Sequence, residues 1–280
     1  MSFFRTFIEK PTSASLFSAI FAERCGDIER NIAYGSHSRH FLDIYRPVVG
    51  GAKPPIVIFF YGGSWDSGER EMYGFVGAAL AASGFIAVIP DYRLFPEVVY
   101  PDYMSDAAQA YDWVDNNLAT NADGRSKVFV MGHSAGAHMG ALLAYDRSYL
   151  QEQTPAANLP DGFIGLSGPY SYDPITHELS KHIFVEAKSA GKVRPVHQVT
   201  KGAPPALLIH GKKDPTVEML NAIHMRDALI EVGTPAQAVE YQNLGHIGPL
   251  LALAKPFRWR APIYEQVKDF IRYYSDSSQT

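Results

Sequence analysis

A single serine lies at the centre of a stretch rich in glycine and alanine, directly after a run of apolar residues. The stretch is VFVMGHSAGAHMG, residues 128–140, and Gly132 and Gly136 flank Ser134. A buried strand that turns sharply into a helix leaves no room for a Cβ beside the serine, and it holds the hydroxyl outward in a strained conformation. A serine held this way is suited to nucleophilic attack. The alternative role is that of a helix N-cap, and the order of strand, turn and helix favours the nucleophile.

A serine hydroxyl is a poor nucleophile near neutral pH, so it needs a base within hydrogen-bond reach and an acid that orients that base. Two residues downstream of Ser134 are the candidates: Asp214 ends ALLIHGKKD, and His246 lies in NLGHIG. Both follow predicted strands, and the order Ser, Asp, His is one that such groups adopt. The alternatives are a turn-forming aspartate and a loop histidine. His210 and His224 are weaker candidates for the base, because they lie in or after a strand and on a helix face.

A second glycine pair follows the apolar run of FFYGGSWDSG. An oxyanion formed during attack on a carbonyl needs backbone N–H donors, and glycine allows the backbone to approach closely. The candidates for these donors are Gly63, Ser64 and the residue after the serine, Ala135. Gly62 is expected to supply flexibility. Trp65 is expected to pack in the wall of the pocket, and direct contact with a substrate is its alternative role.

Short apolar runs alternate along the chain with longer segments of helical period. This alternation predicts a mainly parallel sheet covered by helices on both faces, with the site at the carboxyl ends of its strands. The predicted strands are the runs PPIVIFFYGG, FIAVIPDYR, KVFVMGHS, DGFIGLSG, PALLIHGKKD and AVEYQNLGH, with an antiparallel lead-in formed by IERNIAYG and HFLDIYRP. Helices are predicted near Met72–Ser83, Tyr103–Leu118, Ala135–Tyr145, Val217–Val232 and Pro262–Tyr274.

Two segments are candidates for a lid. Residues 1–26 carry aromatic and aliphatic side chains at helical spacing, which predicts an N-terminal arm of two short helices that separate near Pro11. The arm either packs on the domain or forms part of a lid. The main domain is predicted over 27–280. Within it, the insert at about 171–200 is too long for a plain connection between strands, so we expect it to form a cap or a pocket wall.

Composition excludes several classes of protein. Of 280 residues, 46% are hydrophobic and 19% charged, with a net charge of -4, which is typical of a soluble globular chain. Charges of both signs are interspersed, so nucleic acid is not an expected partner. No apolar run is long enough to predict a membrane span. Cys25 is the sole cysteine, and Arg5, Glu9 and Lys10 interrupt any signal sequence, so we expect cytoplasmic residence.

The elbow around Ser134, the GGSW loop, PDYRLFPE, HGKKD and GH occur in this order and resemble the α/β-hydrolase superfamily. The likeness is to carboxylesterases of the HGGXW type, related to bacterial esterases, feruloyl-esterase-like enzymes and kynurenine formamidases, and covers about residues 27–275. It implies a mostly parallel eight-stranded sheet with helices on both faces and a small cap. It also implies a serine carboxylesterase that needs no cofactor and acts through an acyl-enzyme on small-molecule esters. The compact insert at about 171–200 favours short acyl groups.

One residue departs from that resemblance: Tyr61 stands where the motif has a histidine that braces the oxyanion loop. A tyrosine hydroxyl both donates and accepts hydrogen bonds, so Tyr61 is expected either to replace the brace or to reach into the pocket. Tyr61, Gly62, Trp65 and His133 are therefore candidates for the substrate pocket.

Other functions fit the sequence less well. The ten histidines include no HExxH and no paired Cys/His spacing, so no metal site is predicted. A dinucleotide site would need its glycines after the first strand. An aryl formamidase is the alternative within the hydrolases, and a ligand receptor that has lost catalysis on the same scaffold is the alternative outside them. Elsewhere, His138 is expected to pack or face solvent, and Asp91, Arg93 and Glu97 are expected to form one ion-pair group.

Overall fold

The computed structural model describes residues 11–49, 51, 53–121, 124–178 and 180–276. Its centre is an eight-stranded sheet in the order β1-β2-β4-β3-β7-β8-β9-β10, which is the α/β-hydrolase arrangement. β1 pairs antiparallel with β2 and β2 with β4, whereas the six strands from β4 to β10 are parallel. The bounds are β1 Ile28–Ala33, β2 Phe41–Tyr45, β3 Ile56–Phe60, β4 Ile86–Pro90, β7 Val128–His133, β8 Gly162–Leu166, β9 Ala206–Gly211 and β10 Ala236–Tyr241.

The core lies on both faces of the central strands. Every residue of β3, β4, β7, β8 and β9 is buried, as their continuous apolar sequences predict for strands covered on both sides. The edge strands β1 and β10 contain only partly or fully exposed residues. Burial on both faces therefore holds the central strands in place. The carboxyl ends of these strands carry the polar residues named in the sequence analysis.

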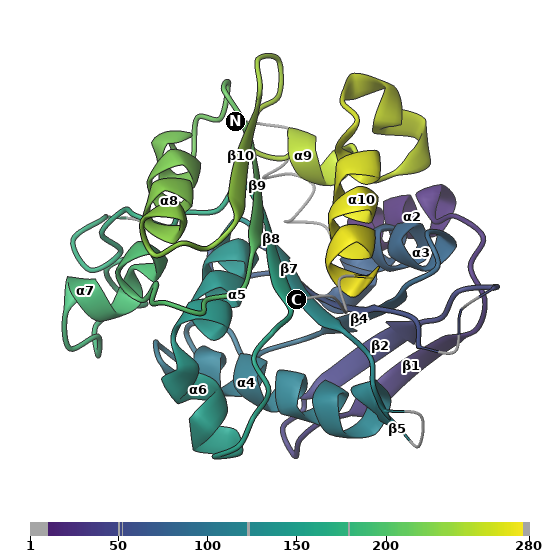
Figure 1. Ribbon diagram of the computed structural model, residues 1–280, viewed down its shortest axis with the longest axis horizontal. Coiled ribbons are helices and arrows are strands. Elements are labelled where there is room, and N and C mark those ends of the chain that lie inside the picture. Colours follow the sequence, from purple (N-terminus) through teal and green to yellow (C-terminus); the bar gives the residue numbers. More distant parts are fainter. Residues whose placement is uncertain (1–10, 50, 52, 122–123, 179, 277–280) are drawn as a thin grey trace.

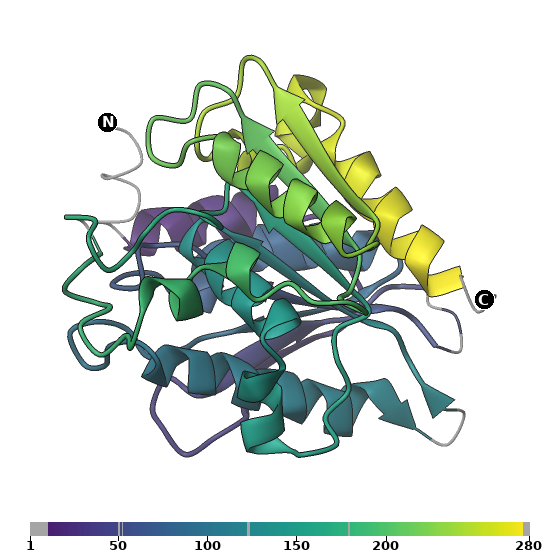
Figure 2. The ribbon, with the colours of Figure 1, turned by 60° about the vertical axis from the view of Figure 1, so that its left-hand side comes forward.

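Helices cover the two faces of the sheet (Figures 1 and 2). One layer contains α4, α5, α6 and α8, and the other contains α2, α3 and α10. A two-stranded ribbon of β5 (Thr120–Asn121) and β6 (Gly124–Arg125) lies outside the main sheet. The helix bounds are α2 Pro11–Phe21, α3 Gly74–Ala82, α4 Asp102–Val114, α5 Ala135–Tyr145, α6 Arg147–Gln153, α7 Ala190–Val193, α8 Leu220–Glu231, α9 Gly248–Leu251 and α10 Ile263–Asp276.

The predicted helices are present, with shifted ends. The helix expected from Met72 begins as a 3-10 turn at Arg70–Tyr73 before α3, and the one expected to reach Leu118 ends in a π-helical turn at Asp115–Ala119. The sequence analysis did not predict α6, although its N-cap is conventional: the Asp146 carboxylate accepts a hydrogen bond from the Ser148 N–H. This helix is too short for a helical spacing of apolar residues to be recognised in the sequence.

The two candidate lid segments lie differently. α2 begins at Pro11, and its Phe17 ring stacks on Phe257 with centroids 6.0 Å apart and meets Phe75 edge-on at 5.7 Å. The described part of the arm thus packs on the domain, whereas residues 1–10 lie outside the described residues. The segment 171–200 contains α7 and a 3-10 turn, Pro195–His197.

In the described ranges no helix has the length and hydropathy needed to span a membrane.

Candidate active site

Ser134 lies in the turn between β7 and α5 with φ 53° and ψ −121°. This is a conformation that non-glycine residues rarely adopt, so the surrounding structure must enforce it. The flanking glycines explain how. A Cβ at Gly132 would lie 2.3 Å from the Gly136 carbonyl oxygen, and one at Gly136 would lie 2.1 Å from the carbonyl oxygen of Phe60. The backbone therefore packs closely on both sides of Ser134, as the sequence predicted.

Three side chains from distant parts of the chain form one line of hydrogen bonds. His246 Nε2 lies 2.8 Å from Ser134 Oγ, and His246 Nδ1 lies 2.8 Å from Asp214 Oδ2. Asp214 follows β9 and His246 follows β10, two neighbouring parallel strands. Because a carboxylate only accepts, Nδ1 carries the proton and Nε2 is left to accept the serine proton.

The Asp214 carboxylate is buried and ionised. Burial on its own would raise the pKa of Asp214, but hydrogen bonds from His210 and His246 outweigh burial and hold it well below the ordinary value. The Thr216 and Val217 N–H groups also donate to Oδ1, at 2.8 and 3.0 Å. The carboxylate can therefore balance a positive charge that develops on His246.

His210 contacts the acid of this line and not the serine: its Nε2 lies 3.1 Å from Asp214 Oδ2. The sequence analysis considered it only as an alternative base. The signal for its position was present in the sequence, because His210 is near the end of β9 and four residues before Asp214. That spacing lets a turn fold the aspartate back onto the strand end.

His133 is also close to the line, but through the backbone. Its Nε2 lies 3.0 Å from the His246 carbonyl oxygen and therefore donates to it. Burial, with His246 nearby, lowers the pKa of His133 to about 3, so the ring is neutral. His133 was expected in the substrate pocket; it is not among the residues that line the cavity, and instead it holds the segment that carries His246.

The loop after β3 lies beside the serine turn in a strained conformation. Gly63, Ser64 and Trp65 have φ values of 132°, 52° and 60°, so three successive residues are on the left-handed side. At Gly63 a Cβ would lie 2.1 Å from the Ser67 carbonyl oxygen, which explains the glycine. The Ser67 hydroxyl and N–H both donate to the Gly63 carbonyl, at 2.9 and 3.1 Å, and these bonds hold the turn.

Tyr61 replaces the motif histidine as part of a buried brace. Its ring is fully buried and lies between those of Tyr73 and Tyr92, with centroid distances of 5.1 and 4.8 Å. Its hydroxyl donates to Asp91 Oδ1 at 2.7 Å and accepts from Arg39 at 2.9 Å. The hydroxyl therefore bonds both members of the ion pair between Arg39 and Asp91. Tyr61 does not line the cavity.

The same brace ties down both ends of the loop. Arg39 donates to the Gly68 carbonyl at 2.8 Å, and the Tyr92 hydroxyl donates to the Tyr61 carbonyl at 2.8 Å. The expectation of one ion-pair group at Asp91, Arg93 and Glu97 is wrong, because their side chains diverge after the strand. Asp91 pairs with Arg70 and Arg39, Arg93 with Asp106, and Glu97 with His37.

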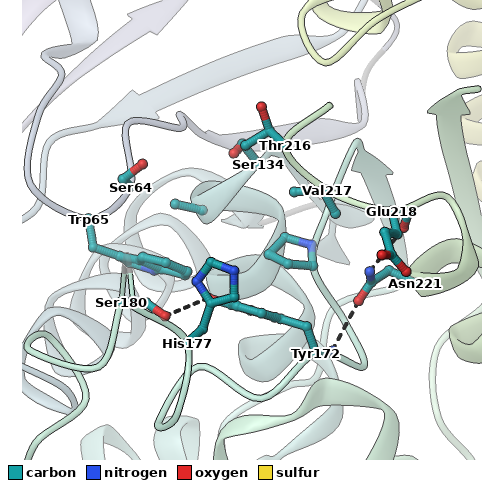
Figure 3. Close-up of a pocket in the computed structure, with 12 residues that line it drawn as sticks. Ser64, Trp65, Ser134, Tyr172, His177, Ser180, Thr216, Val217, Glu218 and Asn221 are labelled. Carbon is teal, nitrogen blue, oxygen red and sulfur yellow. Dashed lines mark hydrogen bonds between the residues drawn. The ribbon is translucent and has the colours of Figure 1, made fainter. Parts of the chain in front are cut away.

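A cavity of about 290 Å³ opens beside Ser134. Figure 3 shows Ser64 and Trp65 on one side of it and Glu218 and Asn221 on the other. Trp65 both lines the cavity and packs in its wall, since its ring is 4% exposed and meets Phe184 edge-on. Gly62, expected here, is not among the lining residues. These are Ser64, Trp65, Ser134, Ala135, Pro169, Tyr172, His177, Ser180, Thr216, Val217, Glu218 and Asn221.

The segment predicted as a cap contributes three of those lining residues, Tyr172, His177 and Ser180.

Outside the cavity, His138 is fully buried and its Nε2 donates to the Val193 carbonyl at 2.7 Å. Among the described residues, no group of three or more His, Cys, Asp or Glu side chains is arranged to hold a metal ion.

Two family models match the chain. The BD-FAE model matches residues 42–161, and the model of the prolyl oligopeptidase family matches residues 102–277. Similar curated proteins include isoprenylcysteine alpha-carbonyl methylesterase ICME of Arabidopsis thaliana, 31% identical over 82% of this chain and 58% of its own length. Esterase LipC of Mycobacterium tuberculosis is 31% identical over 66% of this chain and 51% of its length. The chain thus spans just over half the length of these relatives.

Solved structures share the fold at low identity. Esterase B from Lactobacillus rhamnosis, inhibited by a tributyrin phosphonate, superposes with a TM-score of 0.77 and 18% identity, over 97% of this chain and 94% of that one. A hyperthermophilic esterase from Pyrobaculum calidifontis gives 0.75 and 23% identity, over 96% and 93%. At such identities the likeness establishes the fold, and the geometry of the site must carry any argument about chemistry.

Proposed function

The chain belongs to the α/β-hydrolase superfamily, and on that premise we propose that it is a serine hydrolase that cleaves carboxylic esters. The observation that carries this proposal is the line of two hydrogen bonds, 2.8 Å each, from Ser134 Oγ through His246 to Asp214. It joins a strained serine, a correctly protonated base and an ionised acid beside a cavity. The names of the curated relatives, which include methylesterase and carboxylesterase, support the same reaction class.

The proposed reaction has two halves. In the first, His246 Nε2 accepts the Ser134 proton while Oγ attacks the ester carbonyl, and the resulting imidazolium then protonates the leaving alkoxide. Alcohol departs and the acyl group remains on Oγ. In the second half, His246 takes a proton from water, the hydroxide attacks the acyl carbon, and Ser134 recovers its proton as the acid leaves. Asp214 stays ionised and balances the imidazolium charge.

The oxyanion is proposed to accept hydrogen bonds from the N–H groups of Ala135, Gly63 and Ser64. Two observations support this assignment: Ser64 and Ala135 line the same cavity as Ser134, and the turn at 63–65, which carries Ser64, has left-handed φ values at three successive residues. The brace through Tyr61 supports it further, because donors act best when they are held before the charge develops. Each such donor contributes on the order of 3 kcal/mol to lowering the barrier.

Short acyl esters are the proposed substrates. The cavity volume of about 290 Å³ is at the lower end of ligand sites, and the large Trp65 side chain is among its lining residues. An aryl formamide remains the second candidate, because the aromatic rings of Trp65 and Tyr172 both line the cavity and could stack on an aryl group.

Steady-state turnover tests the proposal directly. We expect hydrolysis of p-nitrophenyl acetate and butyrate, a lower kcat/KM for the octanoate, and loss of turnover in Ser134→Ala. Ser148→Ala, which removes a serine from the exposed N-terminal turn of α6, is the matched control and should match the parent. Failure of the whole ester panel would reject the proposal, and efficient turnover of N-formylkynurenine alone would favour the formamidase.

A further inference from the structure

The buried carboxylate of Asp214 accepts from more partners than a base-orienting acid requires. Oδ1 accepts the N–H groups of Thr216 and Val217, while Oδ2 accepts from His246 Nδ1 at 2.8 Å and also lies 3.1 Å from His210 Nε2. The exposed fractions of the Asp214 and His210 side chains are 1% and 0%. Two histidines, one on strand β9 and one on the loop after β10, therefore approach the same oxygen atom of the acid.

The surroundings of His210 determine its protonation. Its Nε2 faces two groups that only accept, the Asp214 carboxylate and the Val217 carbonyl oxygen at 2.9 Å, so Nε2 must carry a proton. Its Nδ1 is buried without a hydrogen-bond partner. A proton on Nδ1 would be a buried donor with nothing to bind, which is costly. His210 is thus a neutral ring with its single proton on Nε2.

This proton also closes the turn that carries Asp214. The Asp214 N–H donates to the Gly211 carbonyl at 3.1 Å, Val217 N–H donates to Asp214 Oδ1, and the Val217 carbonyl accepts from His210. His210 is on the rigid strand β9, whereas residues 214–217 form a turn beyond its end. The ring therefore fixes the position of the acid relative to the sheet.

We propose that His210 is a positioning residue of the site: its Nε2–H group, which bonds the Val217 carbonyl and lies 3.1 Å from Asp214 Oδ2, fixes the direction in which the Asp214 carboxylate presents itself to His246. This inference rests on the proposed function. His210 itself touches neither Ser134 nor the cavity, so it does not act as a base. Its contribution is to hold Oδ2 in the plane of the His246 Nδ1–H group and to share its negative charge.

Replacing the donor distinguishes positioning from packing. In His210→Phe the ring volume is kept and the hydrogen bond is lost, so kcat/KM should fall about 10- to 100-fold with KM changed less than kcat. Because Oδ2 then loses a competing donor, it stabilises the His246 imidazolium more strongly. The acidic limb of the profile of kcat/KM against pH should therefore move to higher pH. His210→Gln, whose amide can donate in place of Nε2, should restore most of the rate and the position of the limb.

A matched control is available elsewhere in the fold. His40 Nε2 also lies 3.1 Å from a buried carboxylate oxygen, that of Asp106, but outside the site. His40→Phe should leave the pH profile unchanged. If the acidic limb of His210→Phe does not move upward, or if the glutamine variant is as impaired as the phenylalanine variant, His210 has only a structural role and the proposal is wrong.

The unsubstituted protein provides a second test that does not depend on how variants fold. In protein labelled with nitrogen-15 at histidine, the ring shifts of His210 should be those of a neutral ring protonated on Nε2. A proton on Nδ1 would overturn the proposal, since Nε2 could not then donate to Asp214. This measurement also separates the two proposals: if the protein hydrolyses no ester, the proposed function fails, whereas the tautomer still tests the contact.

Discussion

Tyr61 stands where the family motif has a histidine, and its longer side chain reaches different hydrogen-bond partners. A histidine at this position would bind the neighbouring loop at shorter reach, whereas the tyrosine ring passes between Tyr73 and Tyr92 and its hydroxyl meets Asp91 and Arg39. The sequence indicated that Tyr61 would brace the loop or enter the pocket. It could not decide between them, because Arg39 is distant in sequence and its approach depends on the fold of the antiparallel strands.

Removing the Tyr61 hydroxyl should loosen the oxyanion loop. Tyr61→Phe keeps the stacked ring but deprives Asp91 of one donor, and hydrogen bonds to charged groups are worth about 1.5–3 kcal/mol. We expect a kcat lowered about tenfold, a smaller change in KM and a lower melting temperature, measured by steady-state kinetics and calorimetry. Equal kinetics in the variant and the parent would show that the loop does not depend on this brace.

The role of Asp214 gives a second prediction at the same scale. Asp214→Asn preserves the shape of the acid but places an N–H donor near His246, which favours the wrong tautomer and removes the balancing charge. The acylation rate should fall on the order of 10⁴-fold, as in other serine triads, while circular dichroism shows an intact fold. Activity within tenfold of the parent would mean that another group serves as the acid.

Among the secondary-structure elements, strand ends were the most predictable part of the site. The apolar sequences of β3, β7 and β9 located the GGSW loop, Ser134 and Asp214, because both faces of those strands are buried and their ends are marked by glycine or charge. The contact between His210 and Asp214 was not predicted, because His210 was considered only as an alternative base, although its position four residues before Asp214 at the end of β9 was a signal for it. The cap segment was predicted as an insert. Which of its side chains reach the cavity was not predicted, because they lie on irregular backbone that has no periodic pattern.

The close packing of α5 on β3 predicts the effect of a single methyl group. In Gly136→Ala the new Cβ would lie 2.1 Å from the Phe60 carbonyl oxygen and 2.3 Å from that of Tyr61, and neither backbone atom can move without shifting β3. The variant should lose at least about 1–3 kcal/mol of stability together with most activity. Gly51→Ala, where a Cβ meets nothing within 4 Å, is the control and should be neutral. Unaltered melting of the Gly136 variant would argue against this packing.

For the whole molecule, the eight-stranded sheet brings residues from opposite halves of the chain to one edge. The alternation of strands and helices predicted this architecture, because a buried strand and a helix that covers a sheet each have their own spacing of apolar side chains. The sequence did not predict which histidines would be deeply buried. Burial lowers the pKa of His133 to about 3 and that of His138 to about 4, compared with about 6.5 in an unfolded chain.

These buried rings predict that acid destabilises the fold. Between about pH 6.5 and 4 the unfolded chain binds protons at these positions and the folded protein does not, so stability falls as the pH falls. Asp214, whose pKa is lowered in the folded state, acts in the same direction at still lower pH. His138→Gln cannot titrate and should flatten the pH dependence of the melting temperature, with about 3 kcal/mol at stake. Identical curves for variant and parent would contradict the burial of that ring.

The central claim is that Ser134 is the nucleophile, activated through His246 and Asp214. Its most direct test is peptide mapping by mass spectrometry after treatment with a p-nitrophenyl alkylphosphonate, which forms a stable adduct with an activated serine. We predict one adduct per chain, on the peptide that contains Ser134, and none in Ser134→Ala or in the acid-unfolded protein. Stoichiometric modification at a different residue, together with esterase turnover that persists in Ser134→Ala, would contradict the account.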